Sequence, residues 1–194
     1  MKKPIVHKYY QSLFIETAIQ RTLQVLTKYP EKEFSLSELA KEAGVAKANI
    51  GSILNDLHEM NLVEITKLSK IWRIMAKQGS PEFIRNKIIY NLHMIYCNGL
   101  VEFLNYHFNN PKCIVLFGSF RHGDDISTSD IDIAIETDET KEYEIIGLRE
   151  LAGFEKAIGK KFQLHLFNRK TVDINVFNNI ANGVVLSGFL EVRP

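Results

Sequence analysis

Apolar residues at helical spacing divide the first third of the chain into three predicted helices. The first covers residues 9–29 and stops at a proline. Ser35 can cap a short second helix, because a glutamate follows it at the three-residue spacing of a capping box. Gly44 then supplies a tight turn, and the third helix is predicted over residues 46–60 with its isoleucine and leucines facing inward.

Two alternating segments follow at residues 62–68 and 70–76, around the polar turn Ser69–Lys70. They predict a β-hairpin. The order helix, helix, tight turn, helix and hairpin resembles that of a winged helix-turn-helix domain. The resemblance implies a first domain over residues 1–78 in which the hairpin forms the wing.

The sequence "GSPEF" at residues 79–83 interrupts this pattern and starts a new helix. Ser80 as the cap and Pro81 at the first helical position predict one long helix that continues to His107. Its apolar residues lie on more than one face, so it must be covered on several sides. We expect this helix to begin a second domain over residues 79–194, to join the two domains, and to offer a surface for a homodimer.

The rest of the chain mixes strands with helices, which predicts an α+β fold with a small mixed sheet. Strands are predicted at residues 113–119, 130–136 and 161–167. Helices are predicted at residues 140–158, ending at Gly159, and at residues 170–182, closing at Gly183.

Composition and charge narrow the class of protein. Of the 194 residues, 45% are hydrophobic and 24% are charged, which suits compact domains with cores. The net charge of +1 divides into +4 over residues 1–80 and −3 over residues 81–194, which suggests two modules with different partners. No apolar run approaches the roughly 20 residues of a membrane span, and the N-terminus lacks a signal-peptide pattern. The two cysteines lack metal-binding spacing, so we expect a cytoplasmic protein with reduced thiols and no membrane partner.

Two carboxylates interrupt one of the predicted strands. Asp130 and Asp132 share a face, opposite three isoleucines that point into the core. Their Cα atoms lie about 7 Å apart in a strand, so the two charges repel each other and are costly on a buried face without a cation. The alternative is a solvated strand face. The preceding strand ends at Gly118–Ser119, where backbone N–H groups and a hydroxyl suit phosphate oxygens, and this combination favours a magnesium–nucleotide site.

The spacing of these residues carries a family resemblance. Gly118–Ser119, Gly123 and Ser129–Asp130-x-Asp132 match the signature GSxxxGxxxxxSDxD at every fixed position. The stretch resembles the polymerase-beta-type nucleotidyltransferases, in particular their minimal nucleotidyltransferase branch, over about residues 85–190. The resemblance implies a catalytic domain that binds a nucleoside triphosphate, expected to be ATP, together with Mg²⁺ or Mn²⁺.

The same resemblance implies roles for single residues. Asp130 and Asp132 would be the catalytic metal ligands, and Gly118 and Ser119 would hold the phosphates. In such chemistry the metal neutralises the charge that develops on the phosphate under in-line attack.

Other residues around the signature have less specific assignments. Arg121 lies above the expected phosphate position, where a guanidinium can clamp a triphosphate, and a solvated loop side chain is the alternative. Ser129 is assigned to nucleotide binding or to a local cap. Asp124 and Asp125 are assigned to the chemistry of the turn itself.

One departure from the family pattern matters for activity. Family members that use two metals have a third carboxylate on the next strand, where this chain has residues 161–167. Gln163 and His165 share one face of that strand, so one of them should stand at the third-ligand position. His165 could act as a base near neutral pH, or it could be structural.

Two functions follow from these residues. The first is a nucleotidyltransferase that passes a nucleoside monophosphate, expected to be AMP, to a protein or small-molecule acceptor and releases pyrophosphate. The second is a DNA-binding transcriptional regulator whose nucleotidyltransferase domain senses a nucleotide with weak activity or none. The pair Asp130 and Asp132 favours the first, and the absence of a third carboxylate favours the second.

The front domain would bind duplex DNA through the third helix and the wing. The candidate contacts are Lys47, Asn49 and Ser52 on the helix and Lys67, Lys70 and Arg73 on the wing. Residues 31–80 carry seven basic and seven acidic side chains, so this domain lacks the excess positive charge that normally dominates DNA affinity. Docking of a protein partner is therefore the alternative.

Overall fold

The computed structural model describes residues 17–68 and 71–192. The chain divides into two compact units, one ending at Tyr90 and the other beginning at Asn91. The boundary therefore falls inside a helix, α4 (Pro81–Tyr96).

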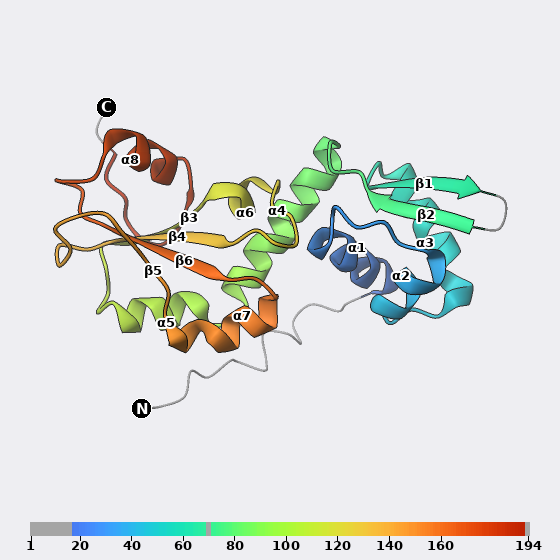
Figure 1. Ribbon diagram of the computed structural model, residues 1–194, viewed down its shortest axis with the longest axis horizontal. Helices are drawn as coiled ribbons and strands as arrows, with labels where there is room; N and C mark the ends of the chain where they lie inside the picture. Colours follow the sequence, from blue (N-terminus) through green and yellow to red (C-terminus); the bar gives the residue numbers. More distant parts are fainter. Residues whose placement is uncertain (1–16, 69–70, 193–194) are drawn as a thin grey trace. The chain divides into compact units, whose positions relative to one another are not determined.

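The N-terminal unit contains three helices and a hairpin (Figure 1). The elements are α1 (Ala18–Lys28), α2 (Leu36–Glu42), α3 (Lys47–Glu59), β1 (Val63–Leu68) and β2 (Ile71–Ala76). The two strands pair antiparallel, and Phe34 adds a bridge to Ile74 on β2. The predicted cap is confirmed, because the Ser35 hydroxyl accepts a hydrogen bond from the backbone N–H of Glu38 at 3.2 Å. The part of the first predicted helix before residue 17 lies outside the described residues.

The core of this unit forms where the inward faces of the helices meet the hairpin. α3 contributes Ile50, Ile53, Leu54 and Leu57, all buried, at the spacing that the sequence pattern predicted. Side chains of this size each contribute about 1.5–3 kcal/mol when they are fully removed from water. The single apolar face of α3 therefore holds the helix against the hairpin and leaves its other face to the solvent.

Hydrogen bonds connect the first turn of α4 to Asn61, which lies between α3 and β1. As predicted, Ser80 caps the helix, since its hydroxyl accepts from the N–H of Phe83 at 3.2 Å. Glu82 in the first turn accepts hydrogen bonds from the side chains of Asn61 at 2.8 Å and Ser80 at 2.9 Å. The hydrogen bond from Asn61, with those from the backbone and Ser80, lowers the pKa of Glu82 to about 2.

The single long helix predicted up to His107 is wrong. The chain forms α4 and then, after a break at Asn98–Gly99, a second helix α5 (Leu100–His107). Gly99 adopts a left-handed backbone with φ of 80°, which glycine accepts without the steric cost that other residues incur. The Asn98 side chain then accepts from the N–H of Leu100 at 3.0 Å and starts the new helix.

The C-terminal unit is built on a mixed sheet, which confirms the predicted α+β class. Its described elements after α5 are β3 (Cys113–Phe117), α6 (Gly118–His122), β4 (Ile131–Glu136), β5 (Glu144–Ile146), the 3₁₀ turn η2 (Arg149–Leu151), α7 (Ala152–Ile158), β6 (Phe162–Phe167), α8 (Ile174–Ala181) and β7 (Val184–Gly188). Within the described residues the strand order is β5-β6-β4-β3-β7, and only β4 and β6 run parallel.

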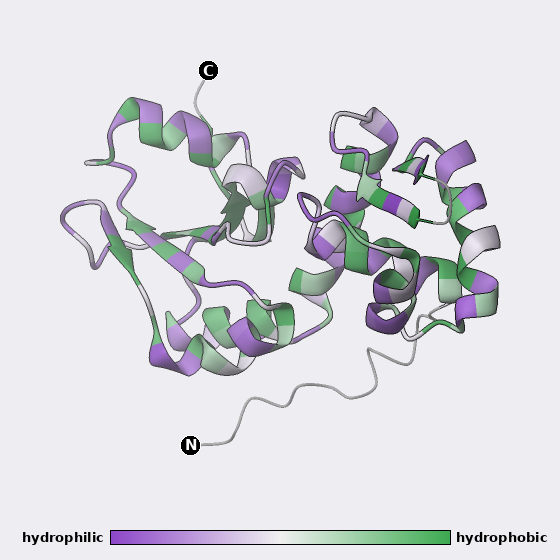
Figure 2. Ribbon diagram, turned by 45° about the vertical axis from the view of Figure 1, so that its right-hand side comes forward, coloured by the Kyte–Doolittle hydropathy of each residue, from purple (hydrophilic) through white to green (hydrophobic). Residues whose placement is uncertain are grey.

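Helices cover both faces of this sheet. Figure 1 shows α8 on one side of the strands and α5 and α7 on the other. The isoleucines of β4 face α5 and α7 in the larger core, whereas Ala134 of β4 and Phe167 of β6 pack with Ile180 of α8. Hydrophilic and hydrophobic residues alternate along α8 in Figure 2, as expected for a helix with one buried face.

Two further expectations need correction. Residues 140–158 are not one helix, because β5 and η2 precede α7, although the helix does end at Gly159 as predicted. The last helix begins at Ile174 rather than near residue 170, since the Asp173 side chain caps it by accepting from the N–H of Asn175 at 2.8 Å. The strand β7 was not predicted.

No helix among the described residues has the length and apolar character needed to cross a membrane.

Candidate active site

The Gly118–Ser119 turn lies directly beside one of the two predicted carboxylates. In the antiparallel pairing of β3 with β4, Phe117 stands opposite Asp132, so the turn begins one residue beyond that pair. Gly118 has a φ of +72°, and a Cβ atom placed on it would lie 2.3 Å from Oδ2 of Asp132. Glycine is therefore required for the backbone conformation, and its lack of a Cβ lets the carboxylate lie directly against the turn.

Asp130 and Asp132 lie on the sheet face that α8 covers further along the strand, where Ala134 is buried. Both side chains remain partly exposed at the start of β4. The strand alternation predicted this shared face. The far end of the same face is not solvated, because Glu136 is only 2% exposed.

Gln163 and His165 of β6 both contact this carboxylate pair, whereas the sequence led us to expect only one of them beside it. The Gln163 side chain donates from Nε2 to Oδ2 of Asp130 at 2.6 Å. His165 reaches Oδ1 of Asp132 from Nε2 at 3.1 Å. In the parallel pairing of β4 with β6, Gln163 stands opposite Asp132 and His165 stands opposite Ala134. Each of the two side chains therefore contacts the aspartate that lies two residues before its own partner on β4.

The ring of His165 is fixed from its other nitrogen by Tyr143, a residue that the sequence analysis missed. The Tyr143 hydroxyl hydrogen-bonds Nδ1 of His165. Because a carboxylate only accepts, Nε2 must carry the proton that points to Asp132, and in the neutral ring Nδ1 then accepts from the Tyr143 hydroxyl. Burial and the charge of Asp132 raise the pKa of Tyr143, which keeps this hydroxyl a donor. The ring of Phe117 packs edge-on against His165, with the ring centres 4.8 Å apart.

The other residues predicted to bind the nucleotide are Ser119, Ser129 and Arg121. Ser119 is half-buried and is the second residue of α6. Ser129 makes a local contact in the loop, since its hydroxyl accepts a hydrogen bond from the N–H of Ile126 at 2.9 Å. Arg121 at the end of α6 contacts the ring of its neighbour His122 at 3.2 Å and remains partly exposed.

Asp125, assigned from the sequence to the turn, is instead buried at 1% exposure. It contacts Asn91 of α4 and Lys160, two residues that the sequence analysis did not single out. No local signal separates Asp125 from its neighbour Asp124, because the two partners lie more than thirty residues away on either side.

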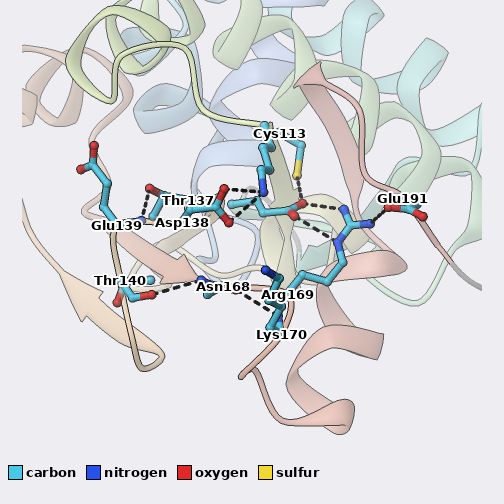
Figure 3. A network of polar contacts seen from close by, with 11 residues as sticks. Cys113, Thr137, Asp138, Glu139, Thr140, Asn168, Arg169, Lys170 and Glu191 are labelled. Carbon is cyan, nitrogen blue, oxygen red and sulfur yellow. Dashed lines mark hydrogen bonds and ion pairs between the residues drawn. The ribbon is translucent and has the colours of Figure 1, made fainter.

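A second polar cluster closes the far end of β4 (Figure 3). Glu136 receives two hydrogen bonds from Arg169, from Nε at 3.0 Å and from Nη2 at 2.7 Å, and one from the thiol of Cys113 at 3.4 Å. Arg169 also pairs with the exposed Glu191 at 2.8 Å. Burial and the negative charge of Glu136 raise the pKa of Cys113 to about 12. Glu136 is therefore engaged by this ion pair and does not add a third carboxylate to Asp130 and Asp132.

An open depression of about 520 Å³ adjoins Asp130. The loop before β4 and the end of α7 line it, and its lining includes Thr128, Lys156 and Lys161. It shares Asp130 with the carboxylate pair, but Asp132, Gln163 and His165 are not among its lining residues.

The donor set suits a metal that arrives with a phosphate ligand rather than one held by protein alone. Among the described residues there is no group of three or more His, Cys, Asp or Glu side chains arranged to hold a metal ion. Mg²⁺ commonly takes one or two carboxylates and completes its coordination with substrate phosphates and water. The two aspartates beside the side-chain-free turn at Gly118 fit that pattern.

The residues predicted to contact DNA in the N-terminal unit lie on its surface wherever the structure describes them. Lys47, Asn49 and Ser52 are exposed on α3. On the hairpin, Arg73 pairs with Glu33 at 2.7 Å, and the ammonium of Lys67 lies 4.1 Å from the ring centre of Trp72. Lys70 lies outside the described residues.

The mixed sheet, the glycine–serine turn and the adjacent carboxylate pair together define a candidate site for phosphate chemistry. Residues 98–188 match the family model described as "Polymerase beta, Nucleotidyltransferase". This part of the chain is therefore similar to the polymerase-beta-type nucleotidyltransferases, which is the resemblance that the signature around Asp130 indicated. No curated protein and no solved structure gave a significant match to the chain.

Proposed function

We propose that the C-terminal unit is a metal-dependent nucleotidyltransferase that moves a nucleoside monophosphate, AMP from ATP, onto a hydroxyl acceptor. The observation that supports this most directly is the contact between the Gly118 turn and the carboxylate of Asp132, where a Cβ would lie 2.3 Å from Oδ2. It brings a backbone suited to phosphate beside two acidic groups, within a segment that matches the family model.

The side chains of this unit divide the chemistry among them. Asp130 and Asp132 would hold Mg²⁺ or Mn²⁺ with the triphosphate, and the ion would neutralise the charge that develops on the phosphate under attack. Gly118 and Ser119 present backbone N–H groups and a hydroxyl to the phosphate oxygens, and Arg121 is close enough in sequence to clamp the outer phosphates.

The proposed step is a substitution at the α-phosphorus of the nucleotide. The acceptor oxygen forms a bond to the α-phosphorus, the bond from that phosphorus to the oxygen bridging to the β-phosphorus breaks, and pyrophosphate leaves. The acceptor proton passes to solvent water, because Asp130 and Asp132 would both be occupied by the metal ion. His165 is not available as a base, because its two ring nitrogens are engaged by Asp132 and Tyr143.

A nucleotide-sensing domain with slow turnover or none is the second candidate. The observation that favours it is that Gln163 and His165, which donate hydrogen bonds to the aspartates, stand where a third carboxylate would add negative charge. Such a site would bind a second metal weakly, and it would retain nucleotide without transferring it efficiently.

Two measurements separate the candidates. Calorimetric titration with ATP, with and without Mg²⁺, should give binding that requires the metal and is abolished in Asp130→Asn/Asp132→Asn. Incubation with ATP labelled on the α-phosphate and with candidate protein or small-molecule acceptors should transfer label if the first candidate is correct. Metal-dependent binding without any transfer supports the sensor, and metal-independent ATP binding refutes both.

For the N-terminal unit we propose a winged helix that binds duplex DNA through α3, with a contribution from the hairpin. Lys47, Asn49 and Ser52 provide exposed polar contacts near the start of α3. The ion pair between Arg73 and Glu33 is exposed, so a DNA phosphate could displace it at little cost. Changing Lys67 and Arg73 to Ala should weaken binding to all sequences and reduce the salt dependence by about one unit of slope for each phosphate that is no longer neutralised. Absence of duplex binding by the unmodified protein at low salt would favour a protein-docking role instead.

A further inference from the structure

The segment that joins the Gly118 turn to Asp130 has no strand of its own. It runs through the five-residue helix α6 and an irregular loop at residues 123–129. Side-chain contacts therefore hold the loop before Asp130 in place relative to the turn. Three polar residues with buried side chains supply them: Asp125 in the loop itself, and Asn91 and Lys160 from distant parts of the chain.

Asn91 of α4 holds the segment from one side. Its side-chain amide donates to the backbone carbonyl of Phe120 at 2.7 Å and to Oδ1 of Asp125 at 2.9 Å. Asn91 is 3% exposed, so both hydrogen bonds form away from water. One side chain thus ties the end of α6 to the carboxylate in the following loop.

Lys160, which lies between α7 and β6, holds the segment from the other side. Its ammonium lies 3.1 Å from Oδ2 of Asp125, and it donates to the backbone carbonyl of Ile126 and, at 3.5 Å, to that of Ser129. Ser129 is the residue immediately before Asp130. The lysine therefore bonds to the loop at three points, the last of them next to the candidate metal ligand.

The burial of this pair makes the arrangement rigid. The side chains of Lys160 and Asp125 are 6% and 1% exposed, so water does not replace either partner if the other is removed. The neighbouring Lys161 makes a superficially similar pair with Glu155 at 2.8 Å, but its side chain is 76% exposed. Adjacent lysines thus provide a buried ion pair and an exposed one for comparison.

We propose that Lys160 is a positioning residue for the candidate active site: through Asp125 and the carbonyls of Ile126 and Ser129 it fixes Asp130 relative to the Gly118 turn. The effect on catalysis rests on the proposed function, because it assumes that Asp130 holds the metal with the nucleotide. The effect on the loop does not depend on that assumption.

The test compares Lys160→Met with Lys161→Met in the full chain. Hydrogen–deuterium exchange of residues 121–130 reports the loop, and calorimetric titration with Mg²⁺ and ATP reports the site, both at a temperature where the variants are folded. Lys160→Met should speed exchange in this segment and weaken Mg²⁺-dependent ATP binding by about 10-fold, the usual size of effect when a group that orients a metal ligand is removed. Lys161→Met should change neither quantity.

Lys160→Met leaves the charge of Asp125 buried without its partner and can fail to fold. In that case Lys160→Met/Asp125→Asn replaces it, because this variant removes both charges and still lacks the lysine contacts to the two carbonyls. The same faster exchange and weaker metal-dependent binding are expected from it.

The outcomes separate the inference from the proposed function. Unchanged exchange in residues 121–130, or faster exchange with ATP binding within two-fold of the unmodified protein, would overturn the positioning role. If the unmodified protein binds no ATP with Mg²⁺, the proposed function fails, and exchange alone then decides whether Lys160 holds the loop. A purely structural lysine would lower thermal stability without changing the Mg²⁺ dependence of binding.

Discussion

Replacing Gln163 with glutamate tests directly whether the two aspartates form a metal site. The Gln163 amide now donates to Oδ2 of Asp130 at 2.6 Å. Gln163→Glu keeps the size of the side chain but turns this donor into a second negative oxygen. Without a metal the two carboxylates repel each other, and with a metal they can share it. The variant should therefore be less stable than the original protein in the absence of Mg²⁺ and regain stability when Mg²⁺ is added.

The expected magnitude follows from the geometry. If the two carboxylates relax until their charges are about 4 Å apart, the repulsion is about 1 kcal/mol in water and about 4 kcal/mol at an effective dielectric constant of 20. Both residues are partly exposed, which favours a loss of about 2 kcal/mol. For a unit of this size such a loss lowers Tm by about 5–10 °C. A metal bound with a Kd of order 1 mM would return about 1.4 kcal/mol at ten times that concentration.

The assay is thermal unfolding with and without Mg²⁺, with NaCl used to match the ionic strength. Gln163→Ala is the control, because it removes the hydrogen bond without adding charge and its Tm should not respond to Mg²⁺. A Mg²⁺-induced shift in Tm that is no larger for Gln163→Glu than for Gln163→Ala would show that the aspartates do not form a metal site. Equal stability of Gln163→Glu and the original protein without the metal would show that the two carboxylates are not in contact.

Three further predictions concern stability and reactivity. Arg169→Met should lower the free energy of unfolding in urea by about 3–5 kcal/mol, because it leaves Glu136 buried without its ion-pair partner. Glu191→Gln, at the exposed end of the cluster, should lower it by less than about 1 kcal/mol. Equal losses from the two variants would contradict the role of burial. With its pKa raised to about 12, the Cys113 thiol should resist alkylation at pH 8 until the protein unfolds, and rapid labelling of the native protein would count against this. Because the folded-state pKa of Glu82 is about 2, its contribution to stability should be complete above about pH 4.5 and disappear as the pH falls toward 2. A carboxyl titration near pH 4.5, measured by NMR, would show that its hydrogen bonds do not form.

The sequence predicted the central strands of the sheet well because their signal is local. A continuous apolar run identified β3, and alternation of apolar residues identified β4 and β6, all within two residues of their ends. The alternation also placed Gln163 and His165 on one face. The same reasoning failed at residues 140–158. β5 has only three residues, at the edge of the sheet, and its strand conformation depends on pairing with β6, which lies twenty residues further along the chain.

The signature around Gly118 and Asp132 identified the candidate site from residue spacing alone. That was possible because a tight turn and a strand both fix the positions of nearby side chains through short-range geometry. Which atoms meet across strands is a different matter. The contacts of Gln163 with Asp130 and of His165 with Asp132 depend on the parallel register of β4 and β6, which no local pattern specifies.

Asp124 and Asp125 show most clearly what the tertiary structure decided. As neighbours in the sequence they carry the same charge and the same preference for turns, and the sequence pattern assigned them the same role. Asp124 is exposed, whereas Asp125 is buried between Asn91 and Lys160. The sequence determined where a turn and a carboxylate pair would form, since those follow from interactions between residues close in the chain. Only the folded packing of Asn91 and Lys160 against the loop decided which aspartate would be buried, because the free energy of a buried charge depends on partners that the chain brings together from a distance.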